Sequence, residues 1–144
     1  GILVHPEARA AGSPFSGCYE KYASATALVE AAKRLDPSLD NGRKIFSRFQ
    51  EKQVREVIDA WINEIVYGLI TVIHIFNPSC IVLGGGVMAQ PYVTEQVEKR
   101  TREEIMDSFS NVKICQAQLG NQAGMLGAAS LAWRLLDSEN QKAE

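Results

Sequence analysis

Residues 77–88 read Asn77-Pro78-Ser79-Cys80-Ile81-Val82-Leu83-Gly84-Gly85-Gly86-Val87-Met88, and this stretch decides the fold. An apolar helical pattern ends at Asn77-Pro78, because proline lacks an N–H and disfavours helix in the residue before it. The short apolar run Cys80–Leu83 then predicts a β-strand that is buried on both faces, as in a parallel sheet. Three glycines follow, and a new helical pattern begins near Pro91.

A strand, a glycine turn and a helix in this order indicate a place to hold a phosphate. Glycine lets the backbone turn sharply and approach a ligand closely. The N-terminus of the following helix would present unpaired N–H groups and the positive end of the helix dipole. The plain alternative is a tight strand-to-helix turn that binds nothing.

Residues 84–89 also fit the dinucleotide pattern G-x-G-x-x-A, which is weak by itself. The acidic residue expected after the next strand is missing, because residues 112–115 continue into Gln116-Ala117-Gln118. The lysine and the Ser/Thr of a Walker A loop are absent as well. The sequence therefore favours neither a Rossmann site nor a P-loop.

The chain has 144 residues, 46% of them hydrophobic, which suits about one globular domain. Lys and Arg number 15 against 17 Asp and Glu, so no basic excess suggests nucleic acid or a membrane surface. Three widely spaced cysteines make no disulfide framework and fit a reducing cytoplasm. The most apolar region, residues 62–76, carries Asn63, Glu64 and His74 and falls short of the roughly 20 apolar residues of a membrane span.

Hydrophobic periodicity predicts the remaining elements. We expect helices over residues 18–35, a short helix after a cap at Asp40 or Asn41, a long helix over 52–76 whose second half is inside, and helices over 92–109 and 123–136. The expected inward side chains of the 92–109 helix are Val93, Val97, Ile105 and Met106. Strands over 80–83 and 112–116 with a helix between them form a right-handed parallel βαβ unit. Small residues at the start of the last helix permit close packing, and residues 137–144 form a polar tail that is expected to fray.

Several residues are candidates for chemistry, each with a plainer interpretation. Glu20 falls in the first turn of a helix, where a carboxylate favours the helix dipole, or it hydrogen-bonds sugar hydroxyls. His5 has no metal-ligand partner at useful spacing and fits a surface group. His74 fits a satisfied core histidine. The local spacing of the cysteines forms no zinc ligand cluster, so the residues alone predict no catalytic group and no metal site.

Taken together, these segments resemble the C-terminal half of ROK-family proteins, which are bacterial sugar kinases, related repressors and N-acetylmannosamine kinases. The resemblance is carried by Gly17-Cys18-Tyr19-Glu20 with Tyr22-Ala23-Ser24, by Asn77-Pro78 with residues 81–87, and by residues 123–129. It extends from Ile2 to about Trp133. Order and spacing agree over this range, and the combination is specific although each motif alone is not.

The resemblance implies an α/β fold: the C-terminal lobe of an actin-like, ribonuclease-H-like ATPase, helix-rich with a short parallel sheet. It implies that Gly84, Gly85 and Gly86 line the ATP side and that Glu20 contacts the sugar. Mg²⁺ would accompany ATP, and family members commonly dimerise through this half. On this basis residues 1–136 form the lobe, as a piece of a longer cytoplasmic protein, and residues 137–144 form the tail.

Two departures from the family pattern shape the expectations. The family often has a zinc site, but here only Cys18 is in place, with Ala11 and Ser13 near the other cysteine positions and His5 too late for the histidine. Zinc is therefore not expected. The first phosphate loop and the catalytic aspartate of the family have no counterpart in this sequence, so the missing N-terminal lobe would supply them.

We therefore expect a lobe of an ATP-dependent kinase that phosphorylates a hydroxyl of a hexose or an N-acetylhexosamine, inactive by itself. The alternatives are the sugar-sensing lobe of a ROK-type repressor and a dimerisation module. The sequence does not name the sugar, and residues upstream would separate kinase from repressor.

Overall fold

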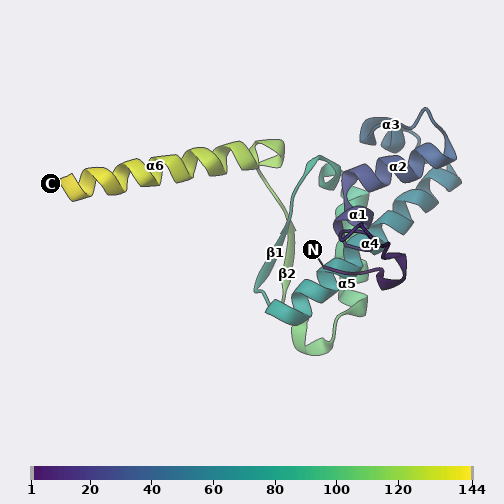
Figure 1. Cartoon of the computed structure of the whole chain (residues 1–144), viewed down its shortest axis with the longest axis horizontal. Coiled ribbons are helices and arrows are strands. Elements are labelled where there is room, and N and C mark those ends of the chain that lie inside the picture. Colours follow the sequence, from purple (N-terminus) through teal and green to yellow (C-terminus); the bar gives the residue numbers. More distant parts are fainter. Residues whose placement is uncertain (1, 144) are drawn as a thin grey trace.

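The computed structural model describes the backbone of residues 2–143, and side chains at 121 and 136–143 lie outside the described part. The longer elements are α1 (Glu20–Ala23), α2 (Ala25–Leu35), α3 (Gly42–Ser47), α4 (Lys52–Phe76), β1 (Cys80–Leu83), α5 (Pro91–Glu104), β2 (Lys113–Gln116) and α6 (Ala123–Ala143). Short 3-10 turns cover Pro6–Ala8, Gly86–Ala89, Asp107–Phe109 and Gly120–Gln122. The predicted architecture, helix-rich with a short parallel sheet, is confirmed (Figure 1).

Helix α4 is the element around which the body is packed. It contacts α1, α2 and α5, and its inward stripe is formed by Val54, Ile58, Trp61, Ile62, Ile65, Val66 and Ile73. α4 also has the length and apolar composition of a membrane-crossing helix, a signal that the core helix of a water-soluble domain gives equally. The expectation that its whole second half is inside is wrong, because Tyr67, Ile75 and Phe76 are exposed.

Strands β1 and β2 form a two-stranded parallel sheet, joined by α5 as the predicted βαβ unit. Cys80 pairs with Lys113 and Leu83 pairs with Gln116. Ile81, Leu83 and Ile114 pack toward the helices, whereas Cys80, Val82 and Cys115 are exposed on the opposite face. The prediction that β1 is buried on both faces is therefore wrong, because no described element covers the second face of this sheet.

Two predicted helices are each interrupted. The helix expected over residues 18–35 breaks at Ser24, whose extended backbone lets its Oγ accept from Ala27 N and cap α2. The helix expected over 92–109 ends at Glu104, because Ile105 is extended. The break leaves Ile105 buried but turns Met106 outward, so Met106 is not the core residue that its spacing predicted.

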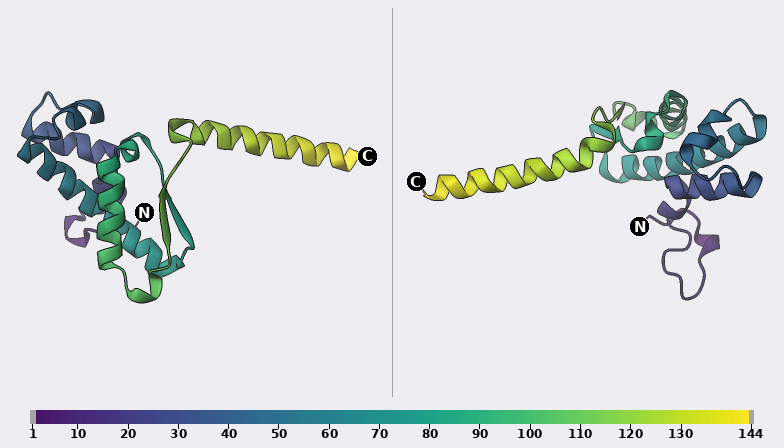
Figure 2. Two further views of the ribbon diagram at one scale, coloured as in Figure 1. Left: turned by 180° about the vertical axis from the view of Figure 1, so that it is seen from behind. Right: turned by 90° about the horizontal axis from the view of Figure 1, so that it is seen from above.

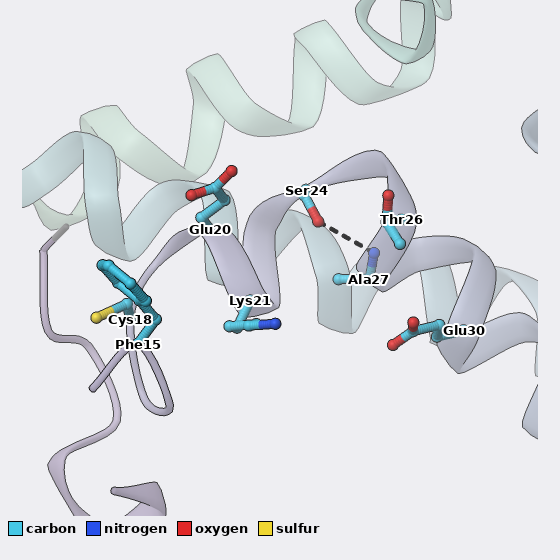
Figure 3. A pocket seen from close by; sticks show the side chains of 8 residues that line it. All are labelled: Phe15, Cys18, Glu20, Lys21, Ser24, Thr26, Ala27 and Glu30. Atoms are coloured by element: carbon cyan, nitrogen blue, oxygen red, sulfur yellow. Dashed lines mark hydrogen bonds between the residues drawn. The ribbon is translucent and has the colours of Figure 1, made fainter. Parts of the chain in front are cut away.

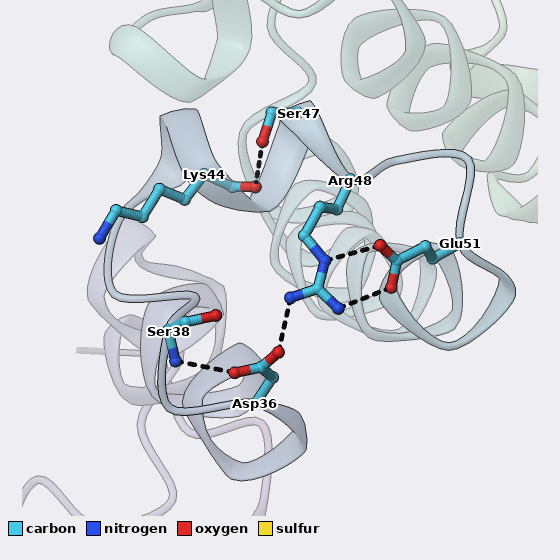
Figure 4. Close-up of polar contacts among 6 residues, drawn as sticks. All are labelled: Asp36, Ser38, Lys44, Ser47, Arg48 and Glu51. Carbon is cyan, nitrogen blue, oxygen red and sulfur yellow. Dashed lines mark hydrogen bonds and ion pairs between the residues drawn. The ribbon is translucent and has the colours of Figure 1, made fainter.

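A cluster of charged side chains joins the C-terminal end of α2 to the N-terminal end of α4 (Figure 4). Arg48 donates to Asp36, the C-cap of α2, at 2.6 Å and to Glu51, the N-cap of α4, at 2.6 and 2.7 Å. This contact lowers the pKa of Asp36 to about 2. Asn41 caps α3 by accepting from Lys44 N, as the sequence predicted for Asp40 or Asn41.

Helix α6 projects away from the body as a single rod (Figures 1 and 2). An added Cβ at Gly124 or Gly127 would meet no described atom within 4 Å, so the close packing predicted for the start of this helix is not observed. Met125, Leu131 and Trp133 are exposed by 63–69%. The backbone stays helical to Ala143, through most of the segment expected to fray.

Candidate functional site

Glu20 is the first residue of α1, and the residues before it are held firmly. Leu3 forms a β-bridge with Cys18, and Tyr19 N donates to Ile2 O at 2.7 Å. The hydroxyl of Tyr19 donates to the carbonyl of Ile65 on α4 at 3.2 Å. Glu20 itself is exposed, whereas the neighbouring Tyr19 is hydrogen-bonded to the central helix.

Tyr19 reaches α4 only because residue 68 is glycine. A Cβ at Gly68 would lie 2.2 Å from Cε2 of the Tyr19 ring, far inside van der Waals contact. Gly68 thus leaves the space on α4 that is occupied by the ring of Tyr19, the residue next to Glu20.

His5 makes a second connection between the N-terminal segment and α4. Its Nε2 lies 2.8 Å from Glu64 Oε2 and its Nδ1 lies 2.8 Å from Glu7 Oε1. The hydrogen bonds to Glu64 and then Glu7 raise the pKa of His5, since a ring that faces two carboxylates is favoured as imidazolium. The ring also packs on Tyr22 with centroids 4.2 Å apart. The sequence did not predict this contact, because Glu64 is distant along the chain and local spacing gives no signal.

A cavity of about 470 Å³ opens beside Glu20 (Figure 3). Its walls come from the loop before α1 and from α1 and α2, and it is lined by Phe15, Cys18, Glu20, Lys21, Ser24, Thr26, Ala27 and Glu30. Carboxylates, an ammonium and hydroxyls beside one aromatic ring suit a small polyhydroxylated ligand. The structure thus places the predicted sugar ligand Glu20 in the wall of a cavity large enough for a monosaccharide.

A second cavity, of about 140 Å³, lies at the carboxyl ends of β1 and β2. It is lined by Leu83, Gly84, Gly85, Gly86, Ala89, Gln116, Ala117 and Gly120. The three predicted glycines lie here beside Ala117 and Gly120, two residues after β2 that the sequence did not indicate as part of a site. The glycines after β1 lie near the residues after β2 because the strands are parallel and end at the same edge of the sheet. At this edge Ala117 N donates to Leu83 O at 2.8 Å.

Gly85 lies in the wall of this cavity and has an unusual backbone conformation. Its φ of +106° is one that side chains rarely adopt, and an added Cβ would meet no described atom within 4 Å. Ligands of open α/β sheets bind at the carboxyl ends of the strands. With a volume of about 140 Å³, the cavity is too small to enclose a nucleotide by itself.

The two cavities have no lining residue in common. Among the residues whose side chains are described, no group of three His, Cys, Asp or Glu could hold a metal ion. In the loop before Cys18, Ser16 Oγ donates to Ser13 O at 2.7 Å and accepts from Ala10 N at 2.8 Å. Hydrogen bonds of Ser16 therefore close the loop that holds Ala11 and Ser13, which stand near the zinc-ligand positions of the family pattern.

Comparison with protein families gives a match to the ROK family over residues 2–134. The chain belongs to the ROK family. The glucokinase of Thermotoga maritima is 27% identical over 148 residues, covering 90% of this chain and 47% of that protein. The fructokinase of Zymomonas mobilis is 32% identical over 129 residues, covering 87% of this chain and 38% of that protein.

Solved structures of ROK proteins have the same fold. The ROK hexokinase from Thermus thermophilus superimposes with a TM-score of 0.73 at 26% identity, over 94% of this chain and 48% of that one. A ROK glucokinase from Streptomyces griseus, solved with glucose and AMPPNP, gives 0.69 at 27% identity over 81% and 44%. The actin-like ATPase fold implied by the family resemblance is thereby confirmed. This ROK chain spans about half the length of its relatives or less.

Proposed function

We propose that this chain is the C-terminal lobe of a cytoplasmic ROK sugar kinase, which transfers the γ-phosphate of ATP to a hydroxyl of a hexose or an N-acetylhexosamine. The observation that carries the proposal is the pair of separate cavities, one walled by Glu20 and one by Gly84–86. Relatives that include glucokinases and a fructokinase support the same reaction class.

Each cavity has the chemistry that its proposed ligand requires. The carboxylate of Glu20 accepts hydrogen bonds from sugar hydroxyls, and a charged hydrogen bond of this kind contributes about 1.5–3 kcal/mol. The glycine turn lets phosphate oxygens approach backbone N–H groups without meeting a side chain. ATP with Mg²⁺ supplies the transferred phosphoryl group when bound, and these residues bind and orient the two substrates.

The catalytic aspartate and the first phosphate loop of the family pattern have no counterpart in this sequence, so we expect no turnover by the chain alone. A coupled ATP-consumption assay over a panel of hexoses and N-acetylhexosamines measures this. Sugar-dependent consumption of ATP above the blank without protein would show that the described lobe already contains the base.

The assignment of the two cavities is tested by ligand-observed NMR on this chain, with an ATP analogue and with glucose, fructose and N-acetylglucosamine titrated separately. Gly85→Val is expected to weaken nucleotide binding tenfold or more, about 1.4 kcal/mol, and to leave the sugar signal unchanged. Glu20→Ala is expected to do the reverse. Two variants that weaken the same ligand, or neither, would refute the assignment.

Matched controls separate loss of a ligand contact from loss of structure. Gly12→Val carries the same kind of strain as Gly85→Val, because Gly12 has a φ of +79° and open space beyond it, but it lies outside the glycine cavity. Glu103→Ala removes an exposed helical carboxylate away from both cavities. Thermal melts of all four variants show whether each is folded.

A second candidate is the sugar-sensing lobe of a ROK regulator. A ROK transcriptional regulator homologous to the E. coli MLC protein superimposes with a TM-score of 0.69 at 23% identity, which shows the shared fold. A regulator is expected to bind sugar in the Glu20 cavity and no nucleotide at the glycine turn. The same titrations therefore distinguish it from the kinase.

A further inference from the structure

Two cysteine thiols face each other on the exposed side of the sheet. Cys80 begins β1, Cys115 is the third residue of β2, and their sulfur atoms are 3.6 Å apart. Both cysteines are free and exposed, whereas Cys18 is buried. A small oxidant in solution therefore reaches this pair, and Cys18 provides an internal control in the same chain.

The register of the sheet explains why this pair is close but not bonded. Cys80 pairs with Lys113 and Cys115 pairs with Val82, so the two thiols lie diagonally across the parallel strands. A disulfide needs sulfur atoms about 2.05 Å apart. Closing the remaining gap would shift β1 against β2, and disulfides that are strained or exposed are the easily reduced ones.

The strands that would shift are the ones that carry the glycine cavity. Gln116 follows Cys115 directly and lines that cavity, and Leu83 at the end of β1 accepts from Ala117. Strain between Cys80 and Cys115 would therefore act on the edge where Gly84–86 and the residues after β2 meet.

We propose that Cys80 and Cys115 form a site of reversible thiol oxidation, which a peroxide closes to an intrachain disulfide. One thiolate attacks hydrogen peroxide, the O–O bond breaks, hydroxide leaves, and the sulfur becomes a sulfenic acid. The second thiol attacks that sulfur, the S–O bond breaks, and the oxygen leaves as water. Two thiols and one hydrogen peroxide thus give one disulfide and two waters, and a dithiol reductant reverses the product.

The test for the bond uses the purified chain treated with hydrogen peroxide and analysed by intact mass and peptide mapping. The hydrogen bond to Cys80 raises the pKa of the Cys115 thiol, so mildly alkaline buffer is used to speed the reaction. The expected product has lost two hydrogen atoms, contains a Cys80–Cys115 cross-linked peptide, keeps Cys18 as a free thiol, and reverts with dithiothreitol. Cys80→Ser and Cys115→Ser are each expected to lose the cross-link.

Two results would overturn the proposal. One is separate oxidation of Cys80 and Cys115 to sulfinic acids with no cross-linked peptide. The other is a cross-link between chains, seen as a dimer on a non-reducing gel. Circular dichroism of the serine variants shows that a lost cross-link reflects the missing thiol rather than a missing fold.

The effect on the glycine cavity is measured separately by amide hydrogen exchange. Faster exchange is expected for residues 83–86 and 116–117 in the oxidised chain, but not in peroxide-treated Cys80→Ser. Equal exchange in both chains would refute the coupling. Any effect of the disulfide on nucleotide affinity rests on the proposed function. If the nucleotide binds neither the reduced nor the oxidised chain, the proposed function is refuted, but the disulfide and the hydrogen-exchange result are not affected.

Discussion

At the scale of single residues, Gly68 is the position where one methyl group has the largest expected consequence. Gly68→Ala would place a Cβ 2.2 Å from the Tyr19 ring, so the ring would be displaced from its packing position against α4. Overpacking of this kind costs about 1–3 kcal/mol, more than the helix propensity that alanine gains, about 1 kcal/mol. We expect a lower urea midpoint and weaker sugar binding, because Glu20 follows Tyr19.

Gly127→Ala is the matched control for that variant. Gly127 is also inside a helix, but an added Cβ there meets no described atom within 4 Å. It is expected to be neutral or slightly stabilising. Equal midpoints for Gly68→Ala and Gly127→Ala would show that Tyr19 does not depend on the close approach to α4.

His5 makes a pH-dependent contribution whose sign follows from its two carboxylate partners. The pKa of His5 is raised in the folded chain. Its contribution to the free energy of unfolding is therefore complete below its pKa in the unfolded chain, about 6.5. The contribution is lost as the pH rises through its pKa in the folded chain. We expect His5→Gln to lower the urea midpoint more at about pH 6 than at about pH 9. A difference that stays constant over this range would mean that His5 acts by packing on Tyr22 alone.

At the scale of elements, the contact of Arg48 with Asp36 and Glu51 fixes the ends of α2 and α4. The pKa of Asp36 is lowered to about 2 in the folded chain. Its contribution to the free energy of unfolding is therefore present above its pKa in the unfolded chain, about 4, and is lost as the pH falls toward about 2. Arg48→Met is therefore expected to lower the urea midpoint at neutral pH. The difference in urea midpoint between Arg48→Met and the unsubstituted chain should become smaller as the pH falls from about 4 to about 2.

Lys44→Met is the control for this element. It removes an exposed pair with Asp40 on α3, and such pairs contribute little. If Lys44→Met lowers the midpoint as much as Arg48→Met, general surface charge rather than the contact between helix ends explains the loss.

At the scale of the whole molecule, the uncovered apolar surface predicts self-association. Trp61 and Ile65 on α4 are buried and contribute nothing to that surface. It lies on α6 and on the last turn of α4, where Trp133 and Phe76 are exposed by 69% and 72%. Large exposed apolar patches mark interfaces.

We expect sedimentation at tens of micromolar, an order of magnitude suited to weak interfaces, to show species larger than the monomer. Trp133→Lys should shift the distribution toward monomer. Phe15→Lys, which changes an aromatic residue exposed by 64% away from α6, should not. A monomer at all concentrations would contradict the prediction.

Local chemistry determined much of this molecule. Pro78 ends α4, the run from Cys80 to Leu83 is β1 to the residue, and Asn41 caps α3, because capping, proline and strand preferences act over a few residues. The resemblance to the ROK family, carried by motifs in a fixed order, also came from the sequence. So did the candidates Glu20 and Gly84–86, each of which lines a cavity.

Only the tertiary structure decided the contacts between residues far apart in the chain. The pairing of His5 with Glu64, the seat of Tyr19 on Gly68, and the approach of Cys80 to Cys115 depend on how helices and strands pack. The outward face of β1 has the same origin, because a strand of apolar residues gives no sign of whether another layer covers it. Periodicity records which side chains avoid water, and packing alone determines which partner each one meets.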